Sequence, residues 1–222
     1  MPSAIGFDIY GTLVDPLEMN EHLRPVVGEK LADRFSELWR NKQIEYTFRR
    51  ALMRRYEDFG VCTRQSLIYT ANSLGVDLTE GEQERLVEEY QNLQPFPDVI
   101  PGIKALESKA YTLVAFSNGV EATARTLLDQ AGVLEHLHGV ISVDDVKTFK
   151  PDPEVYHYLA RRLGTEPSEI WLVSSNPFDV IGAKAAGLAA AWIQRKPDAR
   201  FDPWEIEPDL VAPDLKALAQ RL

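Results

Sequence analysis

The sequence predicts an α/β fold, in which a doubly wound, Rossmann-like parallel sheet carries an inserted all-helical domain. Short apolar runs recur along the chain and alternate with helix-like segments of about ten residues or more, a pattern typical of parallel sheets covered by helices on both faces. Residues 15–94 instead show helical periodicity and no convincing strand. The length of 222 residues suits a core with an insertion, at roughly 150 residues per domain.

The expected strands are short apolar runs that end at polar or turn-forming residues. The first covers residues 4–9 and is followed by Gly11 and Thr12, which gives it the length and boundary of a buried strand. The later runs are similar and cover residues 112–116, 139–142, 170–173 and 189–193. Helix-like segments separate them, so parallel pairing is expected.

The inserted region has helical patterns of its own. Apolar residues at helical spacing place one face of a helix at Leu31, Phe35, Leu38 and Trp39. Thr79 precedes a charged segment at 80–90 and reads as its N-cap. Three prolines then mark the return to the sheet: Pro95, Pro97 and Pro101. We therefore expect a discontinuous core at 1–14 and 95–222, with the helical domain at 15–94.

Charge and cysteine content limit the class of protein. Lysine and arginine number 24 against 34 aspartate and glutamate residues, a formal net charge of -10, which argues against nucleic-acid binding or a polybasic membrane contact. A single cysteine, Cys62, allows neither an intramolecular disulfide nor a multi-cysteine zinc site. No basic and apolar leader opens the chain, and no apolar run approaches the roughly 20 residues of a membrane span. We expect a cytoplasmic protein without nucleic-acid or membrane partners.

Polar residues follow the expected strands at the points where the strands end. In an open parallel sheet, ligands bind in the crevice outside the carboxyl ends of the strands. The candidate residues at those ends are Asp8, Tyr10, Thr12, Ser117, Asn118, Lys150, Ser174, Asn176 and Asp179. From the pattern alone, Asp8 could also cap the following turn. No zinc-protease, nucleophile-elbow, dinucleotide or phosphate-loop motif is present.

The order of these residues resembles the haloacid dehalogenase superfamily, whose strand-one signature Asp-x-Asp-x-Thr is followed by Ser/Thr, Lys and an acidic motif. Tyr10 stands where the phosphatases of that superfamily have a second Asp to protonate the leaving oxygen, and a halide needs no such proton. Ser175 stands where they have an Asp that coordinates magnesium, so we expect no catalytic metal. The segment Trp39-Arg40-Asn41-Lys42-Gln43-Ile44-Glu45-Tyr46-Thr47 is similar to the helical cap of the L-2-haloacid dehalogenase subfamily.

The resemblance implies roles for the catalytic residues. Asp8 would attack C2 of the substrate and form an aspartyl ester. Lys150 would keep that carboxylate ionised, and Thr12 would hold it by a hydrogen bond. Other residues would orient these groups and position the water that cleaves the ester, namely Ser174, Asn176 and Asp179.

The resemblance also implies a substrate pocket. Arg40, which could otherwise be a surface arginine, would face the departing halide from the cap. Ser117 and Asn118 would bind the substrate carboxylate, with Asn118 also reaching the halide. Tyr10 and Tyr156 would line the pocket, with Tyr156 also hydrogen-bonded to the nucleophile or the lysine.

Together these residues predict hydrolytic dehalogenation of short-chain (S)-2-haloalkanoic acids to (R)-2-hydroxy acids and halide, with no metal and no organic cofactor. The resembled enzymes commonly pair, so a homodimer is expected. Pro177 and Phe178 differ from the residues usual at these positions and leave the pocket size open. Two alternatives remain: a magnesium-dependent phosphohydrolase of the same superfamily, and a catalytically silent protein that binds small anions.

Overall fold

The computed structural model describes residues 2–222 and contains a parallel sheet of six strands in the order β3-β2-β1-β4-β5-β6. Each expected strand is present. The strands are β1 (Ala4–Phe7), β2 (Thr112–Ser117), β3 (Gly139–Ser142), β4 (Ile170–Ser174), β5 (Ala189–Ile193) and β6 (Leu210–Ala212). The edge strand β6 was not expected from the sequence, because it is three residues long and only one of them is buried.

The first strand is shorter than expected. β1 ends at Phe7 rather than at residue 9, and the amide of Asp8 donates to the carbonyl of Val173 on β4 at 3.0 Å. The chain then turns back on itself, with the amide of Leu13 donating to the Ile9 carbonyl at 2.8 Å. This turn directs the polar residues after β1 toward the carboxyl edge of the sheet.

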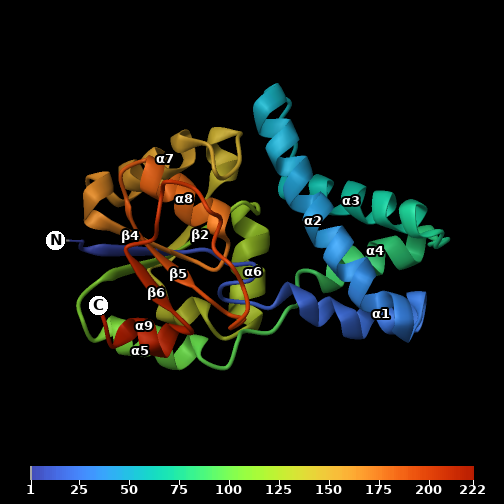
Figure 1. The fold of residues 1–222 in the computed structure, drawn as a ribbon, viewed down its shortest axis with the longest axis horizontal. Coiled ribbons are helices and arrows are strands. Elements are labelled where there is room, and N and C mark those ends of the chain that lie inside the picture. Colours follow the sequence, from blue (N-terminus) through green and yellow to red (C-terminus); the bar gives the residue numbers. More distant parts are fainter. Residues whose placement is uncertain (1) are drawn as a thin grey trace.

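Helices cover both faces of the sheet, as expected for a doubly wound fold (Figure 1). On one face lie α7 (Pro153–Leu163) and α8 (Pro177–Ala185), and on the other lie α5 (Val99–Glu107) and α9 (Leu215–Ala219). The remaining core helix, α6 (Glu121–Gln130), packs against β3. Short 3-10 helices connect these elements: η1 (Pro16–Glu18), η2 (Leu134–His136), η3 (Val143–Val146) and η4 (Pro167–Glu169).

Four helices between β1 and β2 form a separate bundle beside the sheet (Figure 1). They are α1 (Met19–Val27), α2 (Glu29–Met53), α3 (Phe59–Leu74) and α4 (Glu80–Glu89). The long helix α2 packs on α1 and α3 and buries Phe35 and Trp39, two of the residues expected on its apolar face. Thr79 caps α4 in a capping box with Glu82, as its position predicted.

Two short linkers connect the bundle to the core and run side by side. Val14 forms an antiparallel bridge with Pro95. The amide of Asp15 donates to the Gln94 carbonyl at 3.3 Å, and that of Phe96 donates to the Leu13 carbonyl at 3.1 Å. Because the pairing falls at residues 13–15 and 94–96, we propose 15–94 as the inserted domain and 1–14 with 95–222 as the core.

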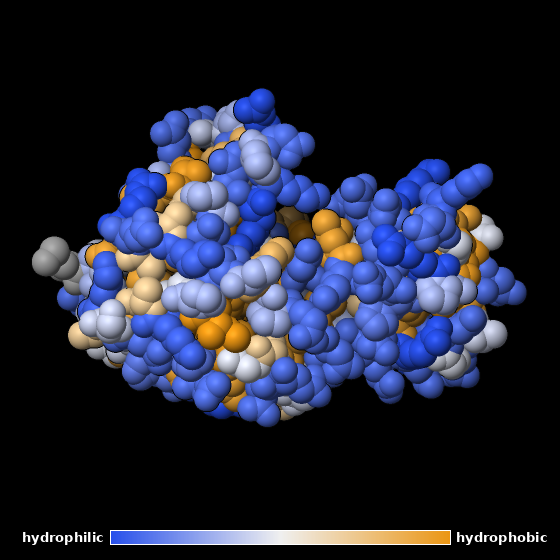
Figure 2. Space-filling view, turned by 90° about the horizontal axis from the view of Figure 1, so that it is seen from below, coloured by the Kyte–Doolittle hydropathy of each residue, from blue (hydrophilic) through white to orange (hydrophobic). Residues whose placement is uncertain are grey.

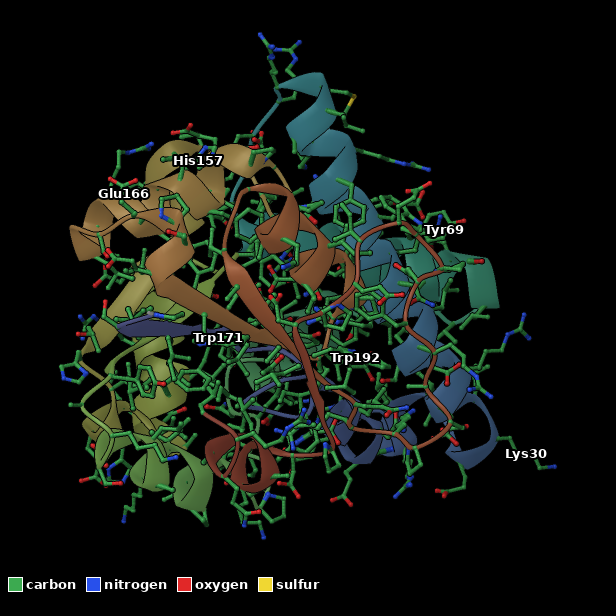
Figure 3. The ribbon with its side chains drawn as sticks, turned by 60° about the vertical axis from the view of Figure 1, so that its left-hand side comes forward. Lys30, Tyr69, His157, Glu166, Trp171 and Trp192 are labelled. Atoms are coloured by element: carbon green, nitrogen blue, oxygen red, sulfur yellow. The ribbon has the colours of Figure 1, made fainter. Side chains whose placement is uncertain are left out.

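The carboxyl ends of the strands face the helical bundle. Trp192, near the carboxyl end of β5, lies on the side of the sheet toward α2, whereas Trp171, near the amino end of β4, lies away from it (Figure 3). Hydrophilic residues cover most of the face in Figure 2, and apolar side chains are visible at the junction of the two parts. Within residues 2–222, no helix is both long and apolar enough to cross a membrane.

Candidate active site

Asp8 lies at the carboxyl end of β1 and is 8% exposed. Its Oδ2 accepts hydrogen bonds from Thr12 Oγ1 at 2.8 Å, Asn176 Nδ2 at 2.8 Å and Ser174 Oγ at 3.3 Å. Its Oδ1 accepts from Lys150 Nζ at 3.1 Å. The carboxylate is therefore held firmly through one oxygen, while the other keeps lone pairs available.

Lys150 joins Asp8 to Asp179. Its ammonium donates to Asp8 Oδ1, to Asp179 Oδ2 at 2.9 Å and to the Phe116 carbonyl at 2.8 Å, and the residue is 1% exposed. Burial alone would lower the pKa of Lys150, but Asp179 and Asp8 outweigh it and raise that pKa above its ordinary value. The lysine therefore stays charged between the two carboxylates.

Tyr156 lies behind this ion pair on α7 and is fully buried. Its hydroxyl donates to Asp179 Oδ1 at 2.8 Å. The predicted hydrogen bond from Tyr156 to Asp8 or Lys150 is wrong, because α7 directs the phenol to Asp179, whose backbone carbonyl also accepts from it at 3.1 Å. Burial, followed by the nearby charge of Asp179, raises the pKa of Tyr156 well above its ordinary value, so the hydroxyl remains a donor.

Arg40 extends from α2 of the bundle toward the turn after β1. Its Nη2 donates to the Tyr10 carbonyl at 3.3 Å, and its Nη1 donates to Gln43 Oε1 at 2.8 Å. Among residues 2–222, no carboxylate forms an ion pair with Arg40. The guanidinium thus brings an uncompensated positive charge to the sheet edge.

Gln43 was not anticipated as a site residue. It is fully buried, and its amide donates to Thr63 Oγ1 at 2.7 Å while its oxygen also accepts from the Tyr90 hydroxyl at 3.1 Å. The signal was available, because residues three apart on a helix lie on the same side. Gln43 fixes the orientation of Arg40.

Ser117 is the last residue of β2, and Asn118 follows it beside Lys150. Asn118 Oδ1 accepts from the backbone amide of Lys150 at 3.0 Å, and within the described residues its Nδ2 has no hydrogen-bond acceptor. Ser117 Oγ accepts from the amide of Gly119 at 2.9 Å. The Asn118 amide hydrogens are therefore free for a ligand, as a carboxylate or halide pocket requires.

Aromatic rings line the side of the site that faces the bundle. The Tyr10 ring packs against Phe59 and Tyr90, with centroids 5.4 Å and 5.5 Å away. Phe178, at the start of α8, meets Phe48 of α2 edge-on at 5.1 Å. Tyr10 from the core with Phe59 and Tyr90 from the bundle gives the site an apolar wall, and the Phe48–Phe178 pair joins α2 to α8.

Ser175 occupies the position at which the resembled phosphatases have a magnesium-binding carboxylate. Its Oγ donates to the Gly11 carbonyl at 2.6 Å, and its amide donates to Thr12 Oγ1 at 2.8 Å. In residues 2–222, no three His, Cys, Asp or Glu side chains lie close enough together to hold a metal. Ser175 instead fastens the turn that carries Thr12.

The fold and the site define a Rossmann-like α/β protein with a buried carboxylate–lysine centre beneath an inserted helical bundle. The pattern of haloacid dehalogenase-like hydrolases matches residues 2–187. The chain belongs to this family.

Particular relatives share nearly the whole length. Haloacetate dehalogenase H-2 of Moraxella sp. (strain B) is 38% identical, over 97% of this chain and 95% of that protein. (S)-2-haloacid dehalogenase 1 of Pseudomonas sp. (strain CBS-3) is 37% identical, over 85% of this chain and 83% of that protein. The solved L-2-haloacid dehalogenase of Xanthobacter autotrophicus, with chloropropionic acid covalently bound, superposes with a TM-score of 0.93 at 32% identity, covering 99% of this chain and 98% of that one. The helical bundle is the cap of this family.

Proposed function

We infer that the protein is a hydrolytic dehalogenase that converts short-chain (S)-2-haloalkanoic acids to (R)-2-hydroxy acids and halide. Relatives named as (S)-2-haloacid dehalogenases and the solved relative carrying covalently bound chloropropionic acid support this activity. The observation that carries the inference is the Asp8 carboxylate, buried beside Lys150 with Oδ1 left available while Oδ2 is held by three donors.

In the first step Asp8 Oδ1 attacks C2 of the substrate in line with the carbon–halogen bond. The new C2–O bond forms as the bonding pair leaves with the halide, so C2 is inverted and Asp8 becomes an ester. Lys150 loses one of its two ionised partners when the ester forms. The fixed hydrogen bonds to Oδ2 hold the carboxylate in the attacking orientation, which lowers the entropy cost of the step.

Two anionic groups, the substrate carboxylate and the departing halide, are assigned to N–H donors and positive charge in the site. The available Nδ2 of Asn118 and the β2 end at Ser117 are assigned to the substrate carboxylate. Arg40, whose guanidinium has no carboxylate partner in the described residues, is assigned to the halide as negative charge develops on it. Tyr10 lies in the apolar wall that excludes water from the displacement.

In the second step water attacks the carbonyl carbon of the Asp8 ester. Asp179 shares the Lys150 ammonium with Asp8 and is assigned as the acceptor of the water proton. The tetrahedral intermediate expels the 2-hydroxy acid oxygen, which takes the water proton back from Asp179. The second water proton is released to solvent as Asp8 returns as a carboxylate. The C2–O bond stays intact, so the inversion from the first step persists in the product.

No metal is assigned to either step. Ser175, at the magnesium-ligand position, donates its hydroxyl hydrogen to the Gly11 carbonyl. Tyr10 stands where a phosphatase would need a carboxylic acid to protonate the leaving group. Burial raises the pKa of the Tyr10 phenol and keeps it neutral, whereas magnesium, a hard cation, binds carboxylate, carbonyl and water oxygens.

The decisive experiment measures halide release from each enantiomer of 2-chloropropionate in EDTA, with the wild type and Asp8→Asn. We expect release from the L form alone, absent in the variant, and a mass increase on the Asp8 peptide in rapidly quenched samples. Magnesium-dependent release of phosphate from a generic phosphate ester, without halide release, would instead make the protein a phosphohydrolase. Inactivity in both assays would favour an anion-binding protein.

We also propose that the protein acts in the cytoplasm as a homodimer. Its single cysteine, Cys62, is free and buried, which suits a reducing compartment, and the family resemblance supports pairing. Sedimentation equilibrium should give twice the chain mass of 25.1 kDa, and a mass of one chain would refute the dimer.

A further inference from the structure

Arg195 lies just past β5 and reaches back beneath the nucleophile turn. Trp192, which Figure 3 shows near the carboxyl end of β5, precedes Arg195 in the chain. The Arg195 side chain is 13% exposed, and its Nη1 donates to Asp98 Oδ1 at 2.6 Å. Its Nη2 donates to the backbone carbonyl of Thr12. One guanidinium therefore joins two segments that are far apart in the sequence.

The Thr12 carbonyl belongs to the residue that holds the nucleophile. Thr12 Oγ1 donates to Asp8 Oδ2 at 2.8 Å, and the residue is fully buried. Within residues 2–222, Arg195 is the one hydrogen-bond donor to this carbonyl. A buried carbonyl left without a donor is energetically costly, so loss of Arg195 would favour a shifted turn and move the Thr12 hydroxyl relative to Asp8.

Arg195 also contacts the second linker between the core and the cap. Its guanidinium stacks over the Phe96 ring, with Cζ 4.1 Å from the centroid. The Phe96 amide donates to the carbonyl of Leu13, next to Thr12. Asp98 Oδ2 accepts from the Leu215 amide at 2.8 Å, which anchors the ion pair to α9. The side chain thus fastens both linkers to the core.

A role in stability alone explains this arrangement poorly. Arg195 Nε is buried without a hydrogen-bond partner, so the burial of the guanidinium is only partly compensated, and buried ion pairs often add little net stability. The two terminal nitrogens donate to different acceptors, Asp98 and the Thr12 carbonyl. A lysine ammonium, a single point charge on a flexible stem, does not reproduce this geometry.

We propose that Arg195 is a positioning residue that couples the cap linkers to the alignment of Asp8. The proposal rests on the proposed function, because its kinetic test uses formation of the Asp8 ester. It assigns Arg195 no contact with substrate. Its effect passes through the Thr12 carbonyl to the Thr12 hydroxyl and then to Asp8 Oδ2.

The test compares Arg195→Ala and Arg195→Lys with Arg221→Ala. Arg221 also donates to a backbone carbonyl, that of Val211, but on the exposed edge strand away from the site. Rapid-quench mass spectrometry with L-2-chloropropionate measures ester formation on folded protein. Because misplacement of a reacting group by about 1 Å can cost roughly 100-fold in rate, we expect a loss of that order in both Arg195 variants and none in Arg221→Ala.

Guanidinium rescue separates positioning from folding. Low millimolar guanidinium chloride should enter the cavity of Arg195→Ala and restore part of the ester-formation rate, while sodium chloride and urea at the same concentration should not. Hydrogen–deuterium exchange should be faster at residues 8–14 and 94–98 in Arg195→Ala, and guanidinium should slow it again.

Some outcomes would overturn the proposal. Folded Arg195 variants that form the ester at the wild-type rate would do so, as would unchanged exchange in the two segments or a rescue that raises Tm without raising the rate. A wild type that releases no halide refutes the proposed function instead. In that case, hydrogen–deuterium exchange at residues 8–14 and 94–98 still tests whether Arg195 holds the two linkers.

Discussion

Lys150 carries a buried positive charge at the centre of the site. It lies between two buried carboxylates, Asp8 and Asp179, and donates to both. Removing one partner of a buried ion pair costs about 3–5 kcal/mol, because the remaining charge is left uncompensated. We expect Lys150→Met to lower the free energy of unfolding by that order at neutral pH, in urea denaturation monitored by circular dichroism.

The pH dependence of this loss follows from the raised pKa of Lys150. Burial opposes the rise, but Asp179 and Asp8 hold the pKa above the ordinary 10.5. A raised pKa contributes stability fully below the unfolded value and loses it as pH rises through the folded value. The difference between wild type and Lys150→Met should be level at neutral to mildly alkaline pH and shrink above 10.5.

The control is Lys147→Met, three residues earlier. Lys147 is 62% exposed and pairs with Asp144 at the surface, so its removal should cost at most about 1 kcal/mol. A Lys150 contribution that already shrinks near neutral pH would mean that burial lowers the pKa of the lysine, contrary to the geometry.

The hydrogen bond from Tyr156 lowers the pKa of Asp179, the proton acceptor assigned to the second step. Burial raises the pKa of Asp179, whereas the charge of Lys150 and the hydrogen bond from Tyr156 lower it. Tyr156→Phe removes that hydrogen bond, so the pKa of Asp179 should rise and the acid limb of ester hydrolysis should move to higher pH. The measurement is the decay rate of the Asp8 ester against pH after a single turnover.

Tyr158→Phe is the matched control, because Tyr158 lies on the same helix with an exposed hydroxyl near Asp145 and Arg162. Its pH profile should equal that of the wild type. An unshifted profile in Tyr156→Phe would remove Asp179 from the role of proton acceptor.

At the scale of elements, α8 and α7 meet at a glycine. A Cβ on Gly182 would lie 2.6 Å from both the Pro151 Cβ and the Tyr156 hydroxyl oxygen, so no side chain fits there without movement. Gly182→Ala should lower the free energy of unfolding by about 1–3 kcal/mol through overpacking. It should also slow ester hydrolysis, because the phenol is pushed away from Asp179.

Gly81→Ala tests whether alanine for a helical glycine is itself harmful. A Cβ at Gly81 in α4 meets no atom within 4 Å, so the change should leave activity unaltered and stabilise the protein by up to about 1 kcal/mol. Thermal unfolding and single-turnover kinetics measure both effects. Equal behaviour of the two variants would contradict close packing at Gly182.

At the scale of the whole molecule, the cap touches the core far from the linkers. Tyr56, between α2 and α3, donates to Asp144 Oδ1 at 2.6 Å and packs on Phe149 at 4.9 Å between ring centroids. Phe149 directly precedes Lys150 in the chain. This contact holds the cap against the loop that carries the lysine, so we expect it to affect how firmly the cap closes over the site.

Tyr56→Phe should keep the ring packing and lose the hydrogen bond. We expect a loss of about 1.5 kcal/mol in the free energy of unfolding, as for a hydrogen bond to a charged group, and a higher KM because the cap closes less firmly. Tyr69→Phe, on the exposed surface of α3, is the control. An unchanged KM in Tyr56→Phe would show that this contact does not govern closure.

Much of the fold could be predicted because local patterns carry it. Apolar runs of strand length alternate with helical segments, and Thr79 before a charged segment predicts the start of α4. The edge strand β6 could not be predicted in this way. Leu210–Ala212 has three residues and pairs only with β5, so its conformation depends on a neighbour distant in the sequence and leaves little periodic signal.

The sequence by itself determined which chemical groups end each strand and the order in which they occur, because covalent order and apolar patterning are local properties. Only the tertiary structure decided how those groups meet: Tyr156 on Asp179 rather than on Lys150, Gln43 behind Arg40, and Arg195 beneath Thr12. The physical reason is that a hydrogen bond depends on distances of about 3 Å, and segments far apart in the chain reach such distances only once the sheet and cap have packed.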